Sequence, residues 1–514
     1  MPDFLQAWAP LLAILVSALG AVAIAATGEK RRNLRETWTI VAAVAKFGLV
    51  ASMLPAVLAG NTPEVKLMQL SPGIELALRV DPAGILFALS ASFLWILTSF
   101  YAFGYMRGTN EKKQTRFFAM LAVCLSATIG ICFSANLLTF VIFYEILSVA
   151  TYPLVIHSGS DKAYRIGRQY LVYAITAGIA LVAGIALVAV AQGAGSAEGL
   201  AAGALDFTAG GFLSPELSPV LLWTIFLAFF IGFGVKAGVM PLHSWLPNAM
   251  IAPTPVSALL HAVAVVKAGV FGFVRLVGYT FGPDLTGAMG AAAMLAAFAG
   301  ATLLLASFIA MTKDDLKARL AYSTVGHLSY IVLGVALLAP TAMLGAAFHM
   351  VTHAAMKITL FFCAGAIYVH TKKKKVSQLD GIGRQMPLTL FAFGVGAVGL
   401  AGVPLVGGFV SKWYLAQGAV DAGSIIFLVF LLLSGMLNAA YLLPIVTRAF
   451  FRSSPEHTRF SEASPLMVVP ITITMLLAIL LGVWPDGIFR FFTLAEMIVE
   501  SVTGVALALP GGLG

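Results

Sequence analysis

Long apolar segments alternate with short polar loops along almost the whole chain. Each segment approaches the roughly 20 apolar residues that a helix needs to cross a bilayer. The segments begin near Leu5, Trp38, Ala83, Phe117, Leu137, Gln169, Leu221, Val256, Gly287, Leu316, Ala342, Leu388, Ser424 and Leu466. The pattern predicts an all-α polytopic membrane protein of about 14 transmembrane helices. The loop between Asn61 and Asp81 is predicted to form a short hairpin outside the membrane.

Composition agrees with this pattern and excludes other classes of protein. Of the 514 residues, 60% are hydrophobic and 10% are charged, whereas soluble domains carry about 25% charged residues. A disordered chain, a disulfide-rich secreted scaffold and an ordinary cytosolic enzyme are therefore excluded. One continuous helical bundle in a lipid bilayer is expected.

The formal net charge of +9 is distributed as an orientation signal. Of the 31 lysines and arginines, 22 fall in loops on one side, and Lys66, Arg79, Arg275 and Arg490 fall on the other. Cytoplasmic loops carry the excess of Lys and Arg, so we expect a multi-pass protein of the cell (inner) membrane with both termini outside. This explanation of the charge argues against nucleic acid as a partner. The segment 5–27 lacks a basic leader and is expected to be the first span rather than a cleaved signal peptide.

Six charged side chains fall inside the predicted spans. They are Lys46, Lys236, Lys267, Lys357, Lys412 and Glu145. A charge facing lipid at the bilayer centre costs about 2.5–3.5 kcal/mol, so these groups should face the protein interior, pair, or bind water. Buried lysines can release a proton, which suits a proton relay. For Lys46 the alternative of extending its ammonium group to the helix end stays open.

Four histidines accompany the intramembrane lysines: His261, His327, His349 and His353. His349, His353 and Lys357 are spaced at i, i+4 and i+8 and therefore share one helical face. Histidine titrates near physiological pH, although a single buried histidine is more often an ordinary core residue. Three titratable groups on one face favour a path for protons.

Two of the predicted spans contain helix-breaking residues around a lysine. Glycines and a proline surround Lys236 in 232–241, and the same residue types precede Lys412 in 402–412. Interrupted backbone at membrane depth is tolerated where it is buried or lines a watery cavity. Paired broken helices in two halves of a chain indicate a transport site. By order these are spans seven and twelve, which cross in opposite directions as an inverted repeat requires.

Several motifs connect the charged positions with a known family. They are Tyr144-Glu145, Lys236 with 241–247 (PLHSWLP), 252–260 (APTPVSALL), 321–325 (AYSTV) and 353–357 (HAAMK). These motifs resemble those of the antiporter-like subunits shared by respiratory complex I and Mrp-type cation/proton antiporters. The resemblance extends over most of the chain, from about residue 117 to residue 412.

The resemblance implies a fourteen-helix bundle with two inverted five-helix repeats. These would comprise residues 117–280 (spans four to eight) and 281–451 (spans nine to thirteen), flanked by a three-helix segment, 1–116, and a final span and tail, 452–514. It also implies that Glu145 pairs with Lys236, that Lys267 is a connecting relay, and that Lys412 is the outlet of a proton path. The partners it implies are other membrane subunits, with protons and, as an open alternative, Na⁺ as transported ions.

Within the family, 408–413 (GFVSKW) look most like the D subunit of Mrp antiporters. The alternative is an M- or N-type proton-pumping subunit of complex I or of a related hydrogenase, in which quinone chemistry on partner subunits supplies the drive. A third hypothesis is a scaffold that transports nothing.

No cofactor or metal is expected on this chain. Cys124, Cys132 and Cys363 lack the spacing of an iron–sulfur site, and no glycine-rich nucleotide loop is present. His349 and His353 have the spacing of a zinc pair but lack the adjacent glutamate of the zinc-protease motif. If electrons drive this protein, their chemistry belongs to other subunits.

Overall fold

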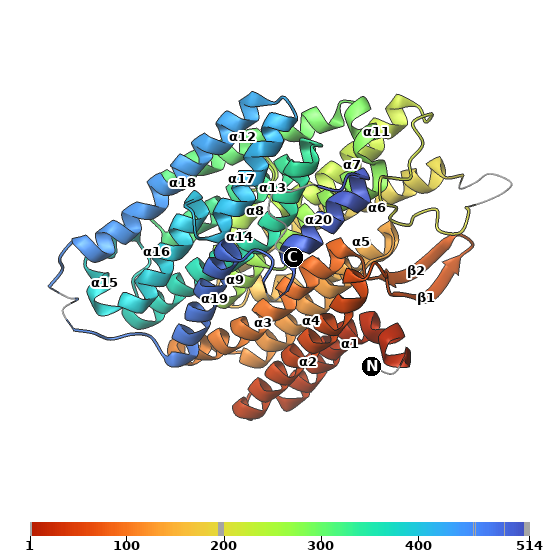
Figure 1. The fold of residues 1–514 in the computed structure, drawn as a ribbon. Coiled ribbons are helices and arrows are strands. Elements are labelled where there is room, and N and C mark those ends of the chain that lie inside the picture. Colours follow the sequence, from red (N-terminus) through yellow and green to blue (C-terminus); the bar gives the residue numbers. More distant parts are fainter. Residues whose placement is uncertain (1–2, 194–199, 456, 458, 488, 508–514) are drawn as a thin grey trace.

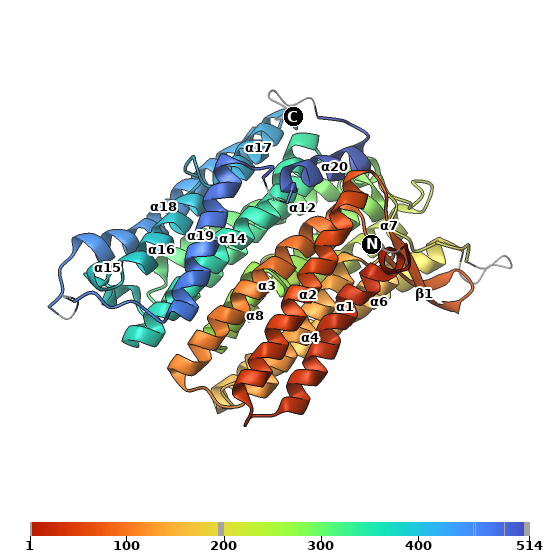
Figure 2. The ribbon, with the colours of Figure 1, turned by 60° about the horizontal axis from the view of Figure 1, so that its bottom comes forward.

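The computed structural model describes residues 3–193, 200–455, 457, 459–487 and 489–507. Its helices lie side by side in one bundle, with a single β-hairpin at the opposite end from α15 (Figures 1 and 2). Twelve helical segments in these ranges are long and apolar enough to cross a membrane. Helix α13 and the pair α16 and α17 occupy the two remaining predicted positions. The predicted multi-pass helical membrane fold is therefore confirmed.

The first half of the chain contains ten elements, of which α7 is the seventh span and α8 follows it. They are α1 (Asp3–Thr27), α2 (Arg32–Leu58), β1 (Glu64–Ser71), β2 (Ile74–Arg79), α3 (Pro82–Thr109), α4 (Gln114–Cys132), α5 (Leu137–Val155), α6 (Asp161–Ala191), α7 (Pro219–Ala237) and α8 (Trp245–Asn248).

The second half begins with a helix that is broken in three pieces. Its elements are η1 (Ala249–Ile251), α9 (Thr254–Ala262), α10 (Val265–Arg275), η2 (Leu276–Phe281), α11 (Pro283–Ala288), α12 (Ala291–Thr312), α13 (Leu316–Ala336), α14 (Pro340–Thr371), η3 (Val376–Gln378), α15 (Ile382–Gln385), α16 (Pro387–Ala401), α17 (Gly407–Asp421), α18 (Ile425–Phe451), α19 (Pro465–Val483) and α20 (Phe491–Thr503).

Polar residues set where the helices begin. Asp81 precedes α3 and accepts a hydrogen bond from the Gly84 backbone N–H at 2.7 Å, while Pro82 occupies the first turn. Asn136 caps α5 in the same way through the Thr139 N–H at 2.9 Å. Such caps satisfy first-turn N–H groups that have no partner within the helix.

The hairpin predicted between Asn61 and Asp81 is present. Strands β1 and β2 pair antiparallel, with Val65 opposite Leu78. Arg79 at its end bonds to Glu64 at 2.8 Å and to Asp206 at 3.2 Å, which ties the hairpin to the segment ahead of α7.

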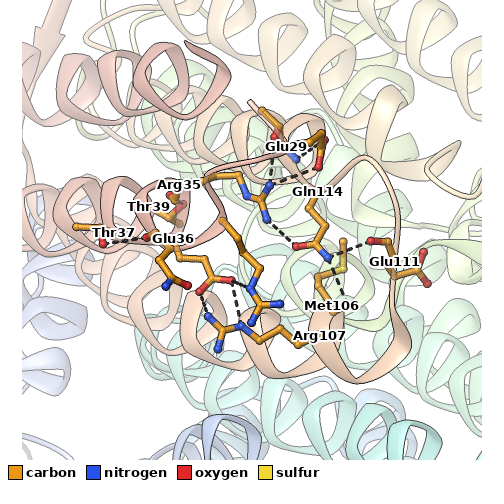
Figure 3. Close-up of polar contacts among 12 residues, drawn as sticks. Glu29, Arg35, Glu36, Thr37, Thr39, Met106, Arg107, Glu111 and Gln114 are labelled. Atoms are coloured by element: carbon orange, nitrogen blue, oxygen red, sulfur yellow. Dashed lines mark hydrogen bonds and ion pairs between the residues drawn. The ribbon is translucent and has the colours of Figure 1, made fainter. Parts of the chain in front are cut away.

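A polar network holds the first three helices against α4 at the opposite end of the bundle (Figure 3). Arg35, whose side chain is 1% exposed, donates to Gln114 Oε1 at 2.7 Å. Glu36 on the same helix accepts hydrogen bonds from Arg107 of α3. Glu29 accepts the backbone N–H of Thr115 at 2.9 Å. Polar residues at the helix ends, with Glu29 from the loop after α1, therefore fix how these helices pack.

The centre of the bundle is formed by the broken helix 254–281 and by α14. The most apolar stretch of each is completely buried within the protein, whereas α2, α18 and α19 expose much of their surface. Helices that contact no lipid can carry polar side chains without exposing them to hydrocarbon.

An ion pair between Arg275 and Asp81 joins the end of α10 to the start of α3. Arg275 is 1% exposed, donates two hydrogen bonds to the Asp81 carboxylate, and lies against the rings of Phe271 and Tyr279. Removing one partner of a buried pair leaves the other charge without compensation.

We predict that Arg275→Gln lowers the stability of the purified protein by about 3–5 kcal/mol, because the largely buried Asp81 carboxylate then loses its cationic partner. Thermal unfolding in detergent measures the change. Lys66→Gln removes an exposed ion pair with Glu75 and serves as the control, with an unchanged midpoint. Equal midpoints for the two variants would contradict a structural role for the buried pair.

Candidate functional site

Helix α7 ends one residue after Lys236. Gly238 closes the helix with φ of 70°, a conformation that favours glycine. The Lys236 side chain is buried, and its Nζ donates to the Tyr144 carbonyl oxygen at 2.6 Å. The same ammonium group lies 3.2 Å from the centroid of the Tyr144 ring. A backbone oxygen and an aromatic face of α5 therefore hold this lysine.

Glu145 points in a different direction from its neighbour Tyr144. Successive residues of a helix are about 100° apart, so Tyr144 faces α7 while Glu145 faces α6. A Cβ on Gly178 of α6 would lie 2.8 Å from Glu145 Cδ, so glycine leaves room for the carboxylate. The carboxylate also borders an apolar hollow between α4, α5 and α6.

The expected direct ion pair between Glu145 and Lys236 is not formed. In the part of the chain that the structure describes, Glu145 Oε1 has no hydrogen-bond partner, and the Lys236 ammonium is bound to Tyr144 instead. The two charges are still close enough to interact electrostatically. The expectation of a direct contact was wrong because adjacent residues of a helix face different neighbouring helices, and here Tyr144 rather than Glu145 faces Lys236.

Lys267 lies near the start of α10, just after a third interruption that the sequence pattern did not predict. The helix is broken at Val263 and Ala264, between α9 and α10. The Lys267 Nζ lies 3.1 Å from His353 Nδ1 on α14. Both side chains are fully enclosed by protein.

Three buried histidines continue from this contact toward α17. The rings of His353 and His327 stack with centroids 5.4 Å apart. His327 Nδ1 lies 3.3 Å from His349 Nε2, and His349 Nδ1 lies 2.8 Å from Ser411 Oγ. Ser411 immediately precedes Lys412. The histidines on α13 and α14 therefore bridge Lys267 and the broken twelfth span.

A second polar branch starts at Lys357, one turn beyond His353 on α14. Its Nζ donates to Ser323 Oγ at 2.7 Å. The Tyr441 hydroxyl lies 2.8 Å from the same oxygen and also bonds to Asn438 Oδ1. This branch runs from α14 through α13 to α18.

Lys412 binds to the end of the preceding helix. Helix α16 stops at Ala401, so the carbonyls of its last turn have no donor within the helix. Lys412 Nζ donates to the Leu400 oxygen at 2.5 Å and to the Ala401 oxygen at 3.3 Å. Asn438 Nδ2 bonds to the Leu400 oxygen at 3.3 Å, so both branches reach the surroundings of Lys412.

Two further candidates lie apart from these hydrogen-bonded branches. His261 is fully buried 5.4 Å from the Phe361 ring, and neither ring nitrogen has a partner among the described residues. Lys46 is fully buried on α2 with its Nζ 4.8 Å from the Trp95 ring centroid. The Lys46 ammonium therefore does not reach the helix end.

Sequence reasoning assigned no role to four residues of the branches: Ser323, Ser411, Asn438 and Tyr441. Each is a hydroxyl or amide in an apolar span, and Asn438 and Tyr441 stand at i, i+3 on one face of α18. That spacing is a weak signal. The two serines give even less warning, because Ser and Thr in helices often bond to their own backbone.

The arrangement is suited to moving protons. A neutral imidazole carries one donor and one acceptor nitrogen, and a hydroxyl carries both functions. Although three histidines gather here, the described residues include no group of three or more His, Cys, Asp or Glu placed to hold a metal ion.

Comparison with known proteins identifies the family. Residues 134–438 match the family model described as NADH:quinone oxidoreductase/Mrp antiporter, TM. The chain belongs to this family. The match includes Lys236, Lys267, Lys357 and Lys412, and it confirms the resemblance drawn from the sequence motifs.

Curated relatives come from both branches of the family. NADH-quinone oxidoreductase subunit N of Desulforudis audaxviator is 32% identical, over 81% of this chain and 83% of that protein. The A/B subunit of the probable K(+)/H(+) antiporter of Rhizobium meliloti is 30% identical over 85% of this chain, which spans only 43% of that protein. Hydrogenase-4 component B of Escherichia coli is 29% identical over 79% of this chain and 62% of that protein.

Two solved structures share the fold over nearly the whole length. A chain of the archaeal membrane-bound sulfane sulfur reductase has a TM-score of 0.84 at 21% identity, covering 96% of this chain and 97% of that one. A chain of the Mrp complex from Dietzia sp. has a TM-score of 0.83 at 20% identity, covering 98% and 99%. At these identities the likeness concerns the fold alone.

We predict that Gly269→Ala impairs the site. A Cβ there would lie 2.2 Å from the Ala237 backbone nitrogen, and overpacking costs about 1–3 kcal/mol. The end of α7 that carries Lys236 would have to move. Gly48→Ala in α2 is the matched control, since a Cβ at Gly48 meets no atom within 4 Å. Thermal unfolding and ion transport in vesicles are the measurements, and equal behaviour of the two variants would contradict the prediction.

Proposed function

We propose that this chain is a proton-translocating subunit of a multisubunit Mrp-type monovalent cation/proton antiporter. The observation that carries the proposal is the row of fully buried side chains from Lys267 through His353, His327 and His349 to Ser411, beside Lys412. Polar and ionisable groups are costly to place in a membrane, so a row of them indicates a function. Membership of the family supports the assignment.

Glu145 and Lys236 would control entry of the proton. The Lys236 ammonium is held by Tyr144, so its charge depends on whether the nearby carboxylate is ionised. An opposite charge favours the ammonium form, and loss of that charge favours release of the proton. The proton would then pass to Lys267, where the buried row begins.

The histidine branch would carry the proton onward. Lys267 can pass a proton to His353 Nδ1, and His349 can exchange one with Ser411 through a 2.8 Å contact. Rotation of an imidazole or a change of tautomer would reset each step. The Lys357 branch offers hydroxyl groups of Ser323 and Tyr441 as a parallel store of protons.

Two inverted repeats, 117–280 and 281–451, are part of the proposal. The breaks after Lys236 and before Lys412 support it, because each repeat would contribute an interrupted helix with a lysine beside the break. We also propose that the Lys- and Arg-rich loops lie in the cytoplasm of a cell whose inner membrane contains the protein.

A redox-driven complex is the second candidate, and the relatives that belong to quinone oxidoreductases and hydrogenases support it. In that case partner subunits would carry the electron chemistry. Purification of the tagged chain with its bound subunits distinguishes the two: small antiporter subunits support the first candidate, and subunits with iron–sulfur or quinone sites support the second.

We predict that Glu145→Ala and Lys236→Ala each abolish cation/proton antiport measured in membrane vesicles, because each removes one half of the control pair. Lys66→Ala on the hairpin is the control and should keep the activity of the unaltered protein. Full transport in both site variants would refute the assignment and would favour a scaffold.

We predict that the histidine branch contributes more to transport than the Lys357 branch. His349→Ala interrupts the contact between His327 and Ser411 and should stop most transport. Tyr441→Phe removes one hydroxyl from the parallel branch and should only slow transport. The double variant reports coupling between the branches. Equal loss in the two single variants would show that the branches form one path.

A further inference from the structure

A cavity of about 440 Å³ lies at the end of the bundle that carries the basic loops. The ends of α3 and α14 and the beginnings of α6, α9 and α13 surround it. Four lysines line the cavity: Lys162, Lys317, Lys373 and Lys374. None of them belongs to the buried row of the proposed proton path.

Lys317 is held in the wall of this cavity. Its Nζ donates to the Ala252 carbonyl oxygen at 2.7 Å, in the segment just before α9. An ammonium group has three donors, so this backbone contact fixes its position and leaves two donors for another acceptor. Lys162 and Lys374 are exposed at the same cavity.

Three helices begin at the cavity, and two of them carry side-chain caps: Ser160 caps α6 and Asp315 caps α13. Helix α9 begins at Thr254 with no side-chain cap, but Pro255 has no N–H and the Val256 N–H donates to the Pro253 oxygen at 3.0 Å, so few of its first N–H groups face the cavity free. Helices α6 and α13 begin beside Lys162 and Lys317. Helix N-termini favour anions through the helix dipole.

Two acidic residues, Asp315 and Glu111, also line the cavity. Asp315 Oδ1 accepts the Ala318 backbone N–H at 2.8 Å as the cap of α13. Glu111 lies 3.8 Å from His157 Nε2, and burial raises the pKa of its carboxyl group. The exposed Lys162 and Lys374 provide the available positive charge of the lining, because Lys373 Nζ already lies 2.7 Å from His457 Nε2.

We propose that this cavity binds a phosphate-bearing anion, either the headgroup of an anionic phospholipid or free phosphate. Basic pockets between transmembrane helices on the cytoplasmic side suit phospholipid headgroups. The hydroxyls of Ser158 and Tyr105 line the same space and can donate to phosphate oxygens. Binding would tie the start of α6 to the starts of α9 and α13, far along the sequence.

The test uses the purified full chain with its native partner subunits. Thermal unfolding is followed with inorganic phosphate in detergent, and separately in nanodiscs of phosphatidylglycerol or of phosphatidylcholine. We expect a higher midpoint with phosphate, with phosphatidylglycerol, or with both, relative to chloride and phosphatidylcholine. A response to phosphatidylglycerol alone assigns the site to a lipid headgroup, and a response to free phosphate assigns it to the small anion.

The decisive comparison is between two double variants of exposed lysines. Lys162→Gln with Lys374→Gln removes two cations of the cavity and should weaken binding by about tenfold or more, as expected for lost charge-assisted hydrogen bonds. Lys372→Gln with Lys375→Gln removes the same charge from the α14–η3 loop without touching the lining. No midpoint rise in the unaltered protein, or an equal response in the two double variants, would overturn the proposal. Lys317→Gln adds a check at the buried wall.

Discussion

Ionised side chains have to be kept away from hydrocarbon, and this constraint organises the whole bundle. A charge at the bilayer centre costs about 2.5–3.5 kcal/mol. The helices that carry Lys267, His353 and Lys357 are therefore enclosed by others on every side. The outer helices present apolar surface to lipid, and Lys267 and the three histidines of α13 and α14 are left in contact with one another.

Interrupted helices supply backbone carbonyl groups that can hold a buried lysine where no carboxylate is in contact with it. Lys236 is bound by the Tyr144 carbonyl and ring, and Lys412 by the last carbonyls of α16. A carbonyl oxygen can accept a hydrogen bond from the charged ammonium and also from the neutral amine, because both forms carry N–H groups. These contacts therefore hold the lysine in place without fixing its charge as strongly as an ion pair would, which agrees with a relay.

Sequence patterning predicted the helices, because hydrocarbon thickness imposes a length and a composition that are visible in every segment. The family came from the resemblance of sequence motifs such as 241–247 and 252–260. The i, i+4, i+8 spacing of His349, His353 and Lys357 placed these residues on one face, since that spacing depends only on helical geometry. The contacts of Ser323 and Tyr441 were not predictable, because they join helices far apart in the sequence. The roles of these side chains in transport stay a prediction.

What the sequence by itself determined is local: which segments enter the membrane, that the seventh and twelfth spans break, and which titratable residues share a face. Only the tertiary structure decided that Glu145 faces α6 while Tyr144 takes the Lys236 ammonium, that the eighth span is also interrupted, and that four lysines meet around one cavity. The physical reason is that periodicity and hydropathy act over a few residues, whereas the direction of a side chain toward a partner depends on how distant helices pack.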